Sequence, residues 1–222
     1  MSSAEPARLD GRLSGRVPRA VRERQLLDIA EKLFVRHGYD GTSIEDVARA
    51  AGVTRPVVYE HHGDKDGLFV ACVRRARREF EQALATATAG AADADVPALL
   101  GQGAELFFAR LQRDPRRCAL LLTTGSGPLG ERLADLRDGT VDRVAALIAV
   151  HAPELTDPAV RAAAARVVVG AAEELARWWL RSPDVPRERV VEHFRTFVTP
   201  GLLAAIGAAR APGPPRARSA RG

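Results

Sequence analysis

Residues 42–61 read TSIEDVARAAGVTRPVVYEH, and they decide the fold. The stretch opens on a capping-box pattern, in which Thr42 or Ser43 stands three residues before Glu45 or Asp46. An apolar face of helical period follows this pattern. The sequence therefore predicts a two-turn helix at the start of the stretch.

Gly52 ends this helix and begins a tight turn. Thr54 is a favoured N-cap residue, and Pro56 falls in the first turn of the next helix, where the missing N–H of proline is tolerated. Two short helices joined in this way have the layout of a helix-turn-helix, whose second helix fits a DNA major groove about 12 Å wide. An αα-hairpin inside an ordinary helical bundle is the alternative that periodicity leaves open.

Helical periods flank the stretch on both sides. One runs from Val21 to Gly38, and a longer one begins at Asp64. The polar face of the longer period carries four arginines, Arg74, Arg75, Arg77 and Arg78. Further helices are expected over residues 97–112, 115–124, 129–151, 158–181 and 186–206. With no alternating strand pattern, the chain is expected to be all-α with about nine helices.

The composition is that of an ordinary globular chain. Its 222 residues are 46% hydrophobic and 27% charged, and Cys72 and Cys118 are far apart in apolar segments, which argues against a disulfide framework and a cysteine-based zinc site. No uncharged apolar run of about 18 residues occurs, so we expect no membrane span and a cytoplasmic location. Four arginines in residues 207–222 supply most of the net charge of +5, so bulk charge says little about DNA.

Residues 38–68, GYDGTSIEDVARAAGVTRPVVYEHHGDKDGL, resemble the N-terminal domain of tetracycline-repressor (TetR) family regulators. The resemblance implies a homodimeric, sequence-specific transcriptional regulator. It further implies a repressor that a small-molecule effector releases from an inverted-repeat operator. An activator, a constitutive DNA binder without an effector, and a helical scaffold that has lost DNA binding are the alternatives left open.

The resemblance also implies which residues meet DNA. Those expected to face base edges are Arg55, Pro56, Val57 and Glu60, and those expected to hold phosphates are Thr42, Thr54, Tyr59, His61 and Lys65. Helix N-termini favour phosphates, and a guanidinium can pair bidentately with guanine, so chemistry supports the assignment. Two residues depart from the family pattern. His62 stands where an aromatic residue is usual, and the Glu60 carboxylate would repel phosphate unless it pairs with cytosine or an arginine.

Four segments follow from these patterns. Residues 1–18 and 208–222 lack apolar periods, so we expect a disordered Arg-containing arm and a disordered basic tail. Residues 19–66 would form the helix-turn-helix DNA-binding domain, and residues 67–207 the ligand-binding and dimerisation domain.

The C-terminal helices carry two further predicted sites. Aromatic and apolar side chains would line a cavity for a small apolar or aromatic effector: Phe107, Phe108, Leu111, Cys118, Leu121, His151, Trp178 and Trp179. The last two helices are apolar over more of their circumference than one core requires, and with the resemblance they look like a dimer-forming pair. The expected interface residues are Val168, Leu175, Val191, Phe194, Val198 and Leu202. Burial of both helices inside a larger monomer core is the alternative.

Residues typical of catalysis do not gather in the sequence. The five histidines show no metal-binding spacing, and neither a Gly-rich phosphate loop nor a nucleophile elbow occurs. Glu31, Glu173 and Glu174 are expected on solvated or salt-bridged helix faces. We therefore expect no enzyme activity, no cofactor and no metal.

Overall fold

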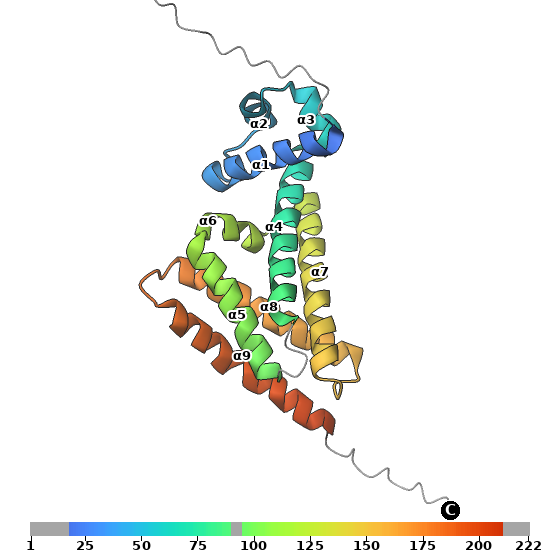
Figure 1. Cartoon of the computed structure of the whole chain (residues 1–222), viewed down its shortest axis with the longest axis vertical. Helices are drawn as coiled ribbons and strands as arrows, with labels where there is room; N and C mark the ends of the chain where they lie inside the picture. Colours follow the sequence, from blue (N-terminus) through green and yellow to red (C-terminus); the bar gives the residue numbers. More distant parts are fainter. Residues whose placement is uncertain (1–17, 90–94, 211–222) are drawn as a thin grey trace, which may run out of the picture.

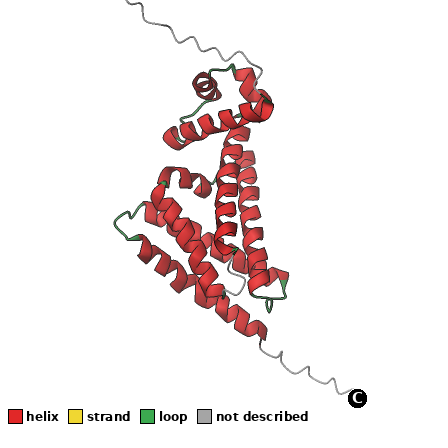
Figure 2. Ribbon diagram, in the orientation of Figure 1, coloured by secondary structure: helices red, strands yellow, loops and turns green. Residues whose placement is uncertain are grey.

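The structure is a computed structural model that describes residues 18–89 and 95–210 of the chain. These residues are almost entirely helical and contain no β-strand (Figures 1 and 2), which confirms the all-α prediction. The elements in order are α1 (Arg19–His37), α2 (Ile44–Ala51), α3 (Arg55–His62), α4 (Lys65–Thr88), α5 (Val96–Arg113), α6 (Pro115–Cys118), a 3-10 helix (Ala119–Leu122), α7 (Gly127–His151), α8 (Pro158–Leu180) and α9 (Arg187–Arg210). The predicted disordered arm and tail lie outside the described residues, apart from Pro18 and from residues 208–210, which continue α9.

Side-chain caps fix the ends of the short helices. Ser43, rather than Thr42, caps α2: its hydroxyl accepts from the Asp46 N–H at 3.1 Å, and the Asp46 carboxylate accepts from the Ser43 N–H at 3.1 Å. Gly52 ends α2 with φ of 63°, the left-handed conformation that glycine adopts without strain. Thr54 precedes α3 as predicted, although its side chain makes no capping hydrogen bond. Because these caps depend on neighbouring residues, the two helices of the helix-turn-helix could be predicted from the sequence.

Helices α1 to α3 form a compact head at one end of the molecule, and α4 runs from this head into the helical body beside α7 (Figure 1). In the core of the head, Leu26, Phe34, Val47 and Val58 pack against Phe69 of α4, and this cluster extends to Leu120 of the 3-10 helix and Leu133 of α7. In the body, α5 packs on α9 and α7 packs on α8. Helix α4 thus belongs to both parts and is the main rigid connection between them.

The arginine face expected on α4 is not all exposed. Arg74 and Arg78 are exposed, and Arg75 is partly exposed, but Arg77 is only 8% exposed because α7 and the 3-10 helix cover it. The helical period identified the polar side of α4 but not which polar positions a neighbouring helix covers. Among the described residues, no helix is long and apolar enough to cross a membrane.

Candidate nucleic-acid interface and ligand cavity

Helix α3 presents one face to solvent and one to the core of the head. Val58 is fully buried, whereas Arg55, Pro56 and Glu60 are exposed and Tyr59 is 50% exposed. The predicted base-facing residues therefore lie on the outer side of α3, apart from Val57, which is half-buried. An eight-residue helix with this exposed face has the dimensions of a groove-reading element.

The two charged residues on this face, Arg55 and Glu60, each form an ion pair with a residue of another helix. Arg55 Nη2 lies 2.9 Å from Glu45 Oε2 on α2, and Glu60 Oε1 lies 3.5 Å from Arg19 Nη1 on α1. Arg19 also donates to the backbone carbonyl of Glu60 at 3.3 Å. Exposed pairs of this kind contribute at most about 1 kcal/mol, so Arg55 can leave Glu45 for a base at little cost. The carboxylate that departs from the family pattern is balanced by Arg19 rather than by Arg55.

The predicted phosphate contacts divide into surface and interior groups. Thr54 and Tyr59 are exposed, and His61 is half-buried. Lys65, in the first turn of α4, lies with Nζ 4.1 Å from the centre of the Tyr39 ring, an arrangement that orients its ammonium group. The hydroxyl of Tyr39 in turn donates to the Asp66 carboxylate. Hydrogen bonding to Asp66, with burial and nearby acidic charge, raises the pKa of Tyr39 to about 12, so this donor stays protonated at neutral pH.

Thr42 was predicted to contact a DNA phosphate, but the structure places it inside the head. The residue is 2% exposed, its hydroxyl donates to the Gly38 carbonyl at 2.9 Å, and its N–H donates to the Tyr39 carbonyl at 3.3 Å. Both donors are therefore satisfied inside the head and do not face a phosphate. The exposed hydroxyl at this position belongs to the neighbouring cap residue Ser43.

His62, the other departure from the family pattern, is the last residue of α3 and is half-buried near Glu23 of α1. Its Nε2 has no hydrogen-bond partner within the described part of the chain. Burial lowers the pKa of His62 below its usual value, against an opposing effect from Glu23 on α1. The imidazole is therefore partly desolvated and favours the neutral form.

A buried carboxylate joins the head to the body. Glu31 on α1 accepts from Arg75 Nε at 2.9 Å and Nη2 at 2.5 Å on α4, and from Arg117 Nε at 2.5 Å on α6. Arg75 also contacts Asp28 at 2.6 Å, and Arg117 contacts Glu79 at 2.7 Å. Burial acts to lower the pKa of Arg117, but hydrogen bonds to Glu31 and Glu79 and the charges of these two carboxylates outweigh it and raise the pKa, so the group remains charged. The Glu31 side chain is 9% exposed, so the junction is salt-bridged, as expected, but not solvated.

The body contains a cavity of about 430 Å³ between α4, α5, α7, α8 and α9. Of the predicted effector residues, Phe107, Leu121 and His151 line it. The other five, Phe108, Leu111, Cys118, Trp178 and Trp179, do not. Phe108 and Leu111 fill the core, and Trp179 donates its indole N–H to the Val185 carbonyl at 2.7 Å.

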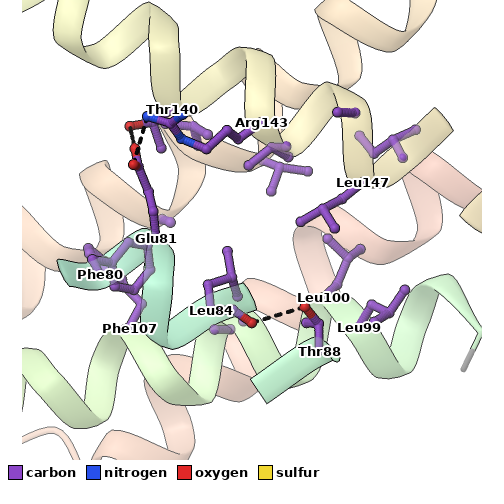
Figure 3. Close-up of a pocket in the computed structure, with 18 of the residues that line it drawn as sticks. Phe80, Glu81, Leu84, Thr88, Leu99, Leu100, Phe107, Thr140, Arg143 and Leu147 are labelled. Carbon is purple, nitrogen blue, oxygen red and sulfur yellow. Dashed lines mark hydrogen bonds and ion pairs between the residues drawn. The ribbon is translucent and has the colours of Figure 1, made fainter. Parts of the chain in front are cut away.

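Most of the lining was missed because it consists of aliphatic and polar side chains from α4, α5, α7 and α8, which carry no aromatic signal in the sequence. Figure 3 shows Leu84, Leu99, Leu100 and Leu147 at this cavity, with Glu81, Thr140 and Arg143 on one side of it. Exposed members of the lining, Ala85 on α4 and Val150 on α7, place its opening between these helices. Within the described residues, no group of three or more His, Cys, Asp or Glu side chains is arranged to hold a metal.

The predicted dimer residues on α9 belong to the monomer core. Val191, Phe194, Val198 and Leu202 are at most 5% exposed because α9 turns them towards α5 and α8. On α8, Val168 and Leu175 are half-buried. The large apolar side chains that these two helices expose are instead Val160, Val167, Leu180, Phe197 and Leu203.

A helix-turn-helix head joined to a helical body with an internal cavity defines the class of helix-turn-helix DNA-binding transcriptional regulators. Comparison with protein families agrees: residues 26–72 match the bacterial regulatory proteins of the tetR family, and residues 97–200 match the tetracyclin repressor-like C-terminal domain. The chain belongs to the TetR family of transcriptional regulators.

The relatives of this chain include a transcriptional activator and a transcriptional repressor. The chain is 28% identical over 203 residues to the transcriptional activator FasR of Mycolicibacterium smegmatis, covering 86% of this chain and 87% of FasR. It is 40% identical over 55 residues to the transcriptional repressor Rv1474c of Mycobacterium tuberculosis, which covers 25% of this chain and 29% of that protein. The solved structure of the multidrug binding protein EbrR complexed with imidazole matches with a TM-score of 0.63 and 25% identity, over 81% of this chain and 89% of EbrR.

Proposed function

We propose that this DNA-binding regulator is a homodimeric repressor that a small-molecule effector releases from an inverted-repeat operator. The observation that carries the proposal is the path of α4. Its first turn holds Lys65 beside the recognition helix, and Arg77, Glu81 and Leu84 of the same helix line the cavity. With a rise of about 1.5 Å per residue, Lys65 and Arg77 are about 18 Å apart along one rigid element. A ligand that tilts α4 would therefore move α3 relative to DNA.

Effector binding is supported by the cavity and by a relative. Its volume of about 430 Å³ lies within the range of small-molecule sites, about 300–1,000 Å³. EbrR, the structural relative at 25% identity, is described as a multidrug binding protein in complex with imidazole. A ligand can shift the equilibrium only by its difference in affinity for the two states, typically by about 1–3 kcal/mol of coupling.

Dimerisation would use the exposed faces of α8 and α9. Phe197 is 72% exposed and stacks on His193, whose ring also meets Trp178 of α8. Together with Val167, 61% exposed, these side chains form an apolar surface that a second copy would cover. A two-fold axis there would place the two α3 helices on half-sites about 34–36 Å apart, or a multiple of one turn, which requires an inverted repeat.

Within the head, we assign base reading to Arg55, Pro56, Val57 and Glu60, and phosphate contacts to Thr54, Tyr59, His61 and Lys65. Residues 19–66 would act as the DNA-binding unit and residues 67–207 as the ligand-binding and dimerisation unit. Because a DNA-binding regulator must share a compartment with its DNA, we place the protein in the cytoplasm.

The activator is the second candidate, and the likeness to FasR favours it. FasR matches most of this chain and is described as an activator, whereas the repressor Rv1474c matches over 55 residues. A reporter fused to the promoter flanking the coding region separates the two. Deletion of the regulator should raise reporter expression if it represses and lower expression if it activates.

The DNA-binding assignment is tested by comparing two arginine variants in binding assays with DNA from the flanking region. Arg55→Ala should weaken operator binding by about 1–3 kcal/mol and relax discrimination at one base pair in each half-site. Arg49→Ala is the matched control, since Arg49 is also exposed and also lies within 3.8 Å of Glu45, but it belongs to α2. A uniform loss on all sequences for Arg55→Ala would show that Arg55 contacts phosphate only.

A further inference from the structure

The wall of the cavity in the body is mainly aliphatic. Figure 3 shows Leu84, Leu99, Leu100 and Leu147 around the open space. Among the described residues that line the cavity, the titratable ones are Arg77, Glu81, Arg143, His151 and Glu173. The partners of these charged side chains therefore decide which ligands the cavity accepts.

Glu81 of α4 and Arg143 of α7 form an ion pair on one side of the cavity (Figure 3). Glu81 Oε2 lies 2.7 Å from Arg143 Nη2, and Glu81 Oε1 accepts a hydrogen bond from the Thr140 hydroxyl at 3.2 Å. The Glu81 side chain is 12% exposed. Its negative charge is thus balanced within the wall and does not call for a positive group on the ligand.

Glu173 and Arg77 are likewise held by protein groups. The Glu173 carboxylate accepts from Arg137 Nε at 2.8 Å and lies 3.9 Å from Arg77 Nη2. Arg77 donates to the Leu121 carbonyl at 2.9 Å and to the Thr140 hydroxyl at 3.2 Å. The Nε of Arg77 has no partner among the described residues, but this atom is buried in the protein, where a ligand does not reach it.

The charges of the wall therefore cancel, since two arginines, Arg77 and Arg143, face two glutamates, Glu81 and Glu173. A charged group on a ligand would lose its water without meeting an unbalanced opposite charge. An apolar body gains free energy from leaving water and packing on the aliphatic wall. His151 lies outside these pairs, and a neutral imidazole can exchange one hydrogen bond with an uncharged group such as a hydroxyl.

We propose that the cavity binds an uncharged, mainly aliphatic molecule, and that the pairing of arginines with glutamates on its wall excludes charged head groups. The entrance agrees with this ligand class, because its exposed residues, Ala85 and Val150, are apolar. The inference rests on the proposed effector function, since it gives the chemical class of the molecule for the same cavity.

The test measures binding of octanol, octanoate and octylammonium to the full chain in the absence of DNA, by equilibrium dialysis below the concentrations at which they form micelles. The three probes share one chain and differ in the head, which near pH 7 is neutral, negative or positive. We expect octanol to bind about tenfold or more tightly than either ion. An ion that binds as tightly as octanol would overturn the inference.

Two variants of the ion pair test the reason for this selectivity. Glu81→Gln leaves an excess positive charge on the wall, so it should bind octanoate about tenfold more tightly than the wild-type chain does. Arg143→Gln leaves an excess negative charge and should favour octylammonium by a smaller factor, because the Arg143 side chain is 59% exposed. Octanol binding should stay unchanged in both. Unchanged affinities for the two ions would overturn the role of charge balance, and if one variant does not fold, the other variant and the wild-type series decide.

A filled cavity shows where octanol binds. Gly103 of α5 lines the cavity, and a Cβ added there would meet only Leu84 Cδ1, at 3.6 Å, so the larger side chain of Gly103→Leu has room to occupy the ligand space. This variant should weaken octanol binding about tenfold. Gln102→Leu is the matched control, because Gln102 is the exposed neighbour on α5 and does not line the cavity; it should keep wild-type affinity. Wild-type octanol affinity in Gly103→Leu would place the ligand elsewhere and overturn the inference.

Operator release is measured separately, so that the two proposals can fail independently. Binding of octanol that depends on Gly103 and leaves operator affinity unchanged would support the ligand class and contradict the effector function. Release of the operator by a charged compound, abolished in Gly103→Leu, would support the effector function and overturn the ligand class.

Discussion

Replacing Glu31 by Gln should uncouple the DNA-binding head from the body at its best-defined junction. The carboxylate accepts three hydrogen bonds of 2.5–2.9 Å from Arg75 and Arg117, and its side chain is 9% exposed. Removing one partner of a buried ion pair typically costs about 3–5 kcal/mol. Both arginines keep second partners, Asp28 and Glu79, and are 24% and 34% exposed, so solvent reduces the effect. We expect Glu31→Gln to lower the free energy of unfolding by about 2–3 kcal/mol.

The assay is urea unfolding followed by circular dichroism at one fixed protein concentration, because dimerisation would make stability depend on concentration. For a chain of this size, the loss corresponds to a fall in melting temperature of about 5–10 °C. Asp28→Asn is the matched control. It removes a carboxylate from the same helix and the same Arg75, but Asp28 is 59% exposed, so the expected loss is below about 1 kcal/mol. If the two variants lose free energy of unfolding to within about 0.5 kcal/mol of each other, the reasoning is refuted, because the burial of Glu31 would then not increase the stability that its ion pairs provide.

Three further predictions concern the head and the outer face of the body. Lys65→Ala should weaken binding to all DNA sequences alike and lower the slope of log affinity against log salt by about one per site, and a change confined to the specific operator would contradict a phosphate contact. The pKa of His62 is lowered in the folded state, so the unfolded chain binds the proton more readily and wild-type stability should fall as the pH drops through about 6.5. The His62→Phe variant should lose less stability than the wild-type chain when melting temperatures are compared above and below that pH. The same pH dependence in the variant and the wild-type chain would contradict a role for His62. Phe197→Asp should shift the protein from dimer to monomer in sedimentation experiments, while Val150→Asp, at 71% exposure on α7, should not; a dimer in both cases would place the interface elsewhere.

The head could be predicted from the sequence because its signals are local. The cap at Ser43, the left-handed Gly52 and the proline in the first turn of α3 each act within a few residues of where they stand. The same locality left the choice between Thr42 and Ser43 open. Only the packed structure shows that Thr42 turns inward to the Gly38 carbonyl.

The body was harder to predict because its sites depend on which helices pack together. Helix α9 has apolar residues on two faces, and periodicity does not say whether Phe194 or Phe197 meets α5. Phe194 is buried and Phe197 is exposed, so the interface prediction fell on the wrong face of α9. Likewise, five α-helices and the 3-10 helix line the cavity, and Arg77 is buried because α7 and the 3-10 helix cover it. Such long-range arrangements leave no signature within one helical period.

The central claim, that α3 is the DNA-reading element of a two-fold symmetric regulator, is tested most directly by selecting bound DNA from a random pool with the wild-type chain and with Arg55→Ala. The account predicts that the wild-type chain enriches an inverted repeat whose half-site centres are about 34–36 Å apart, or a multiple of one turn. It also predicts that Arg55→Ala loses preference at one base pair, symmetrically in both half-sites. Enrichment of no sequence, or of a motif without two-fold symmetry that Arg55→Ala leaves unchanged, would contradict the account.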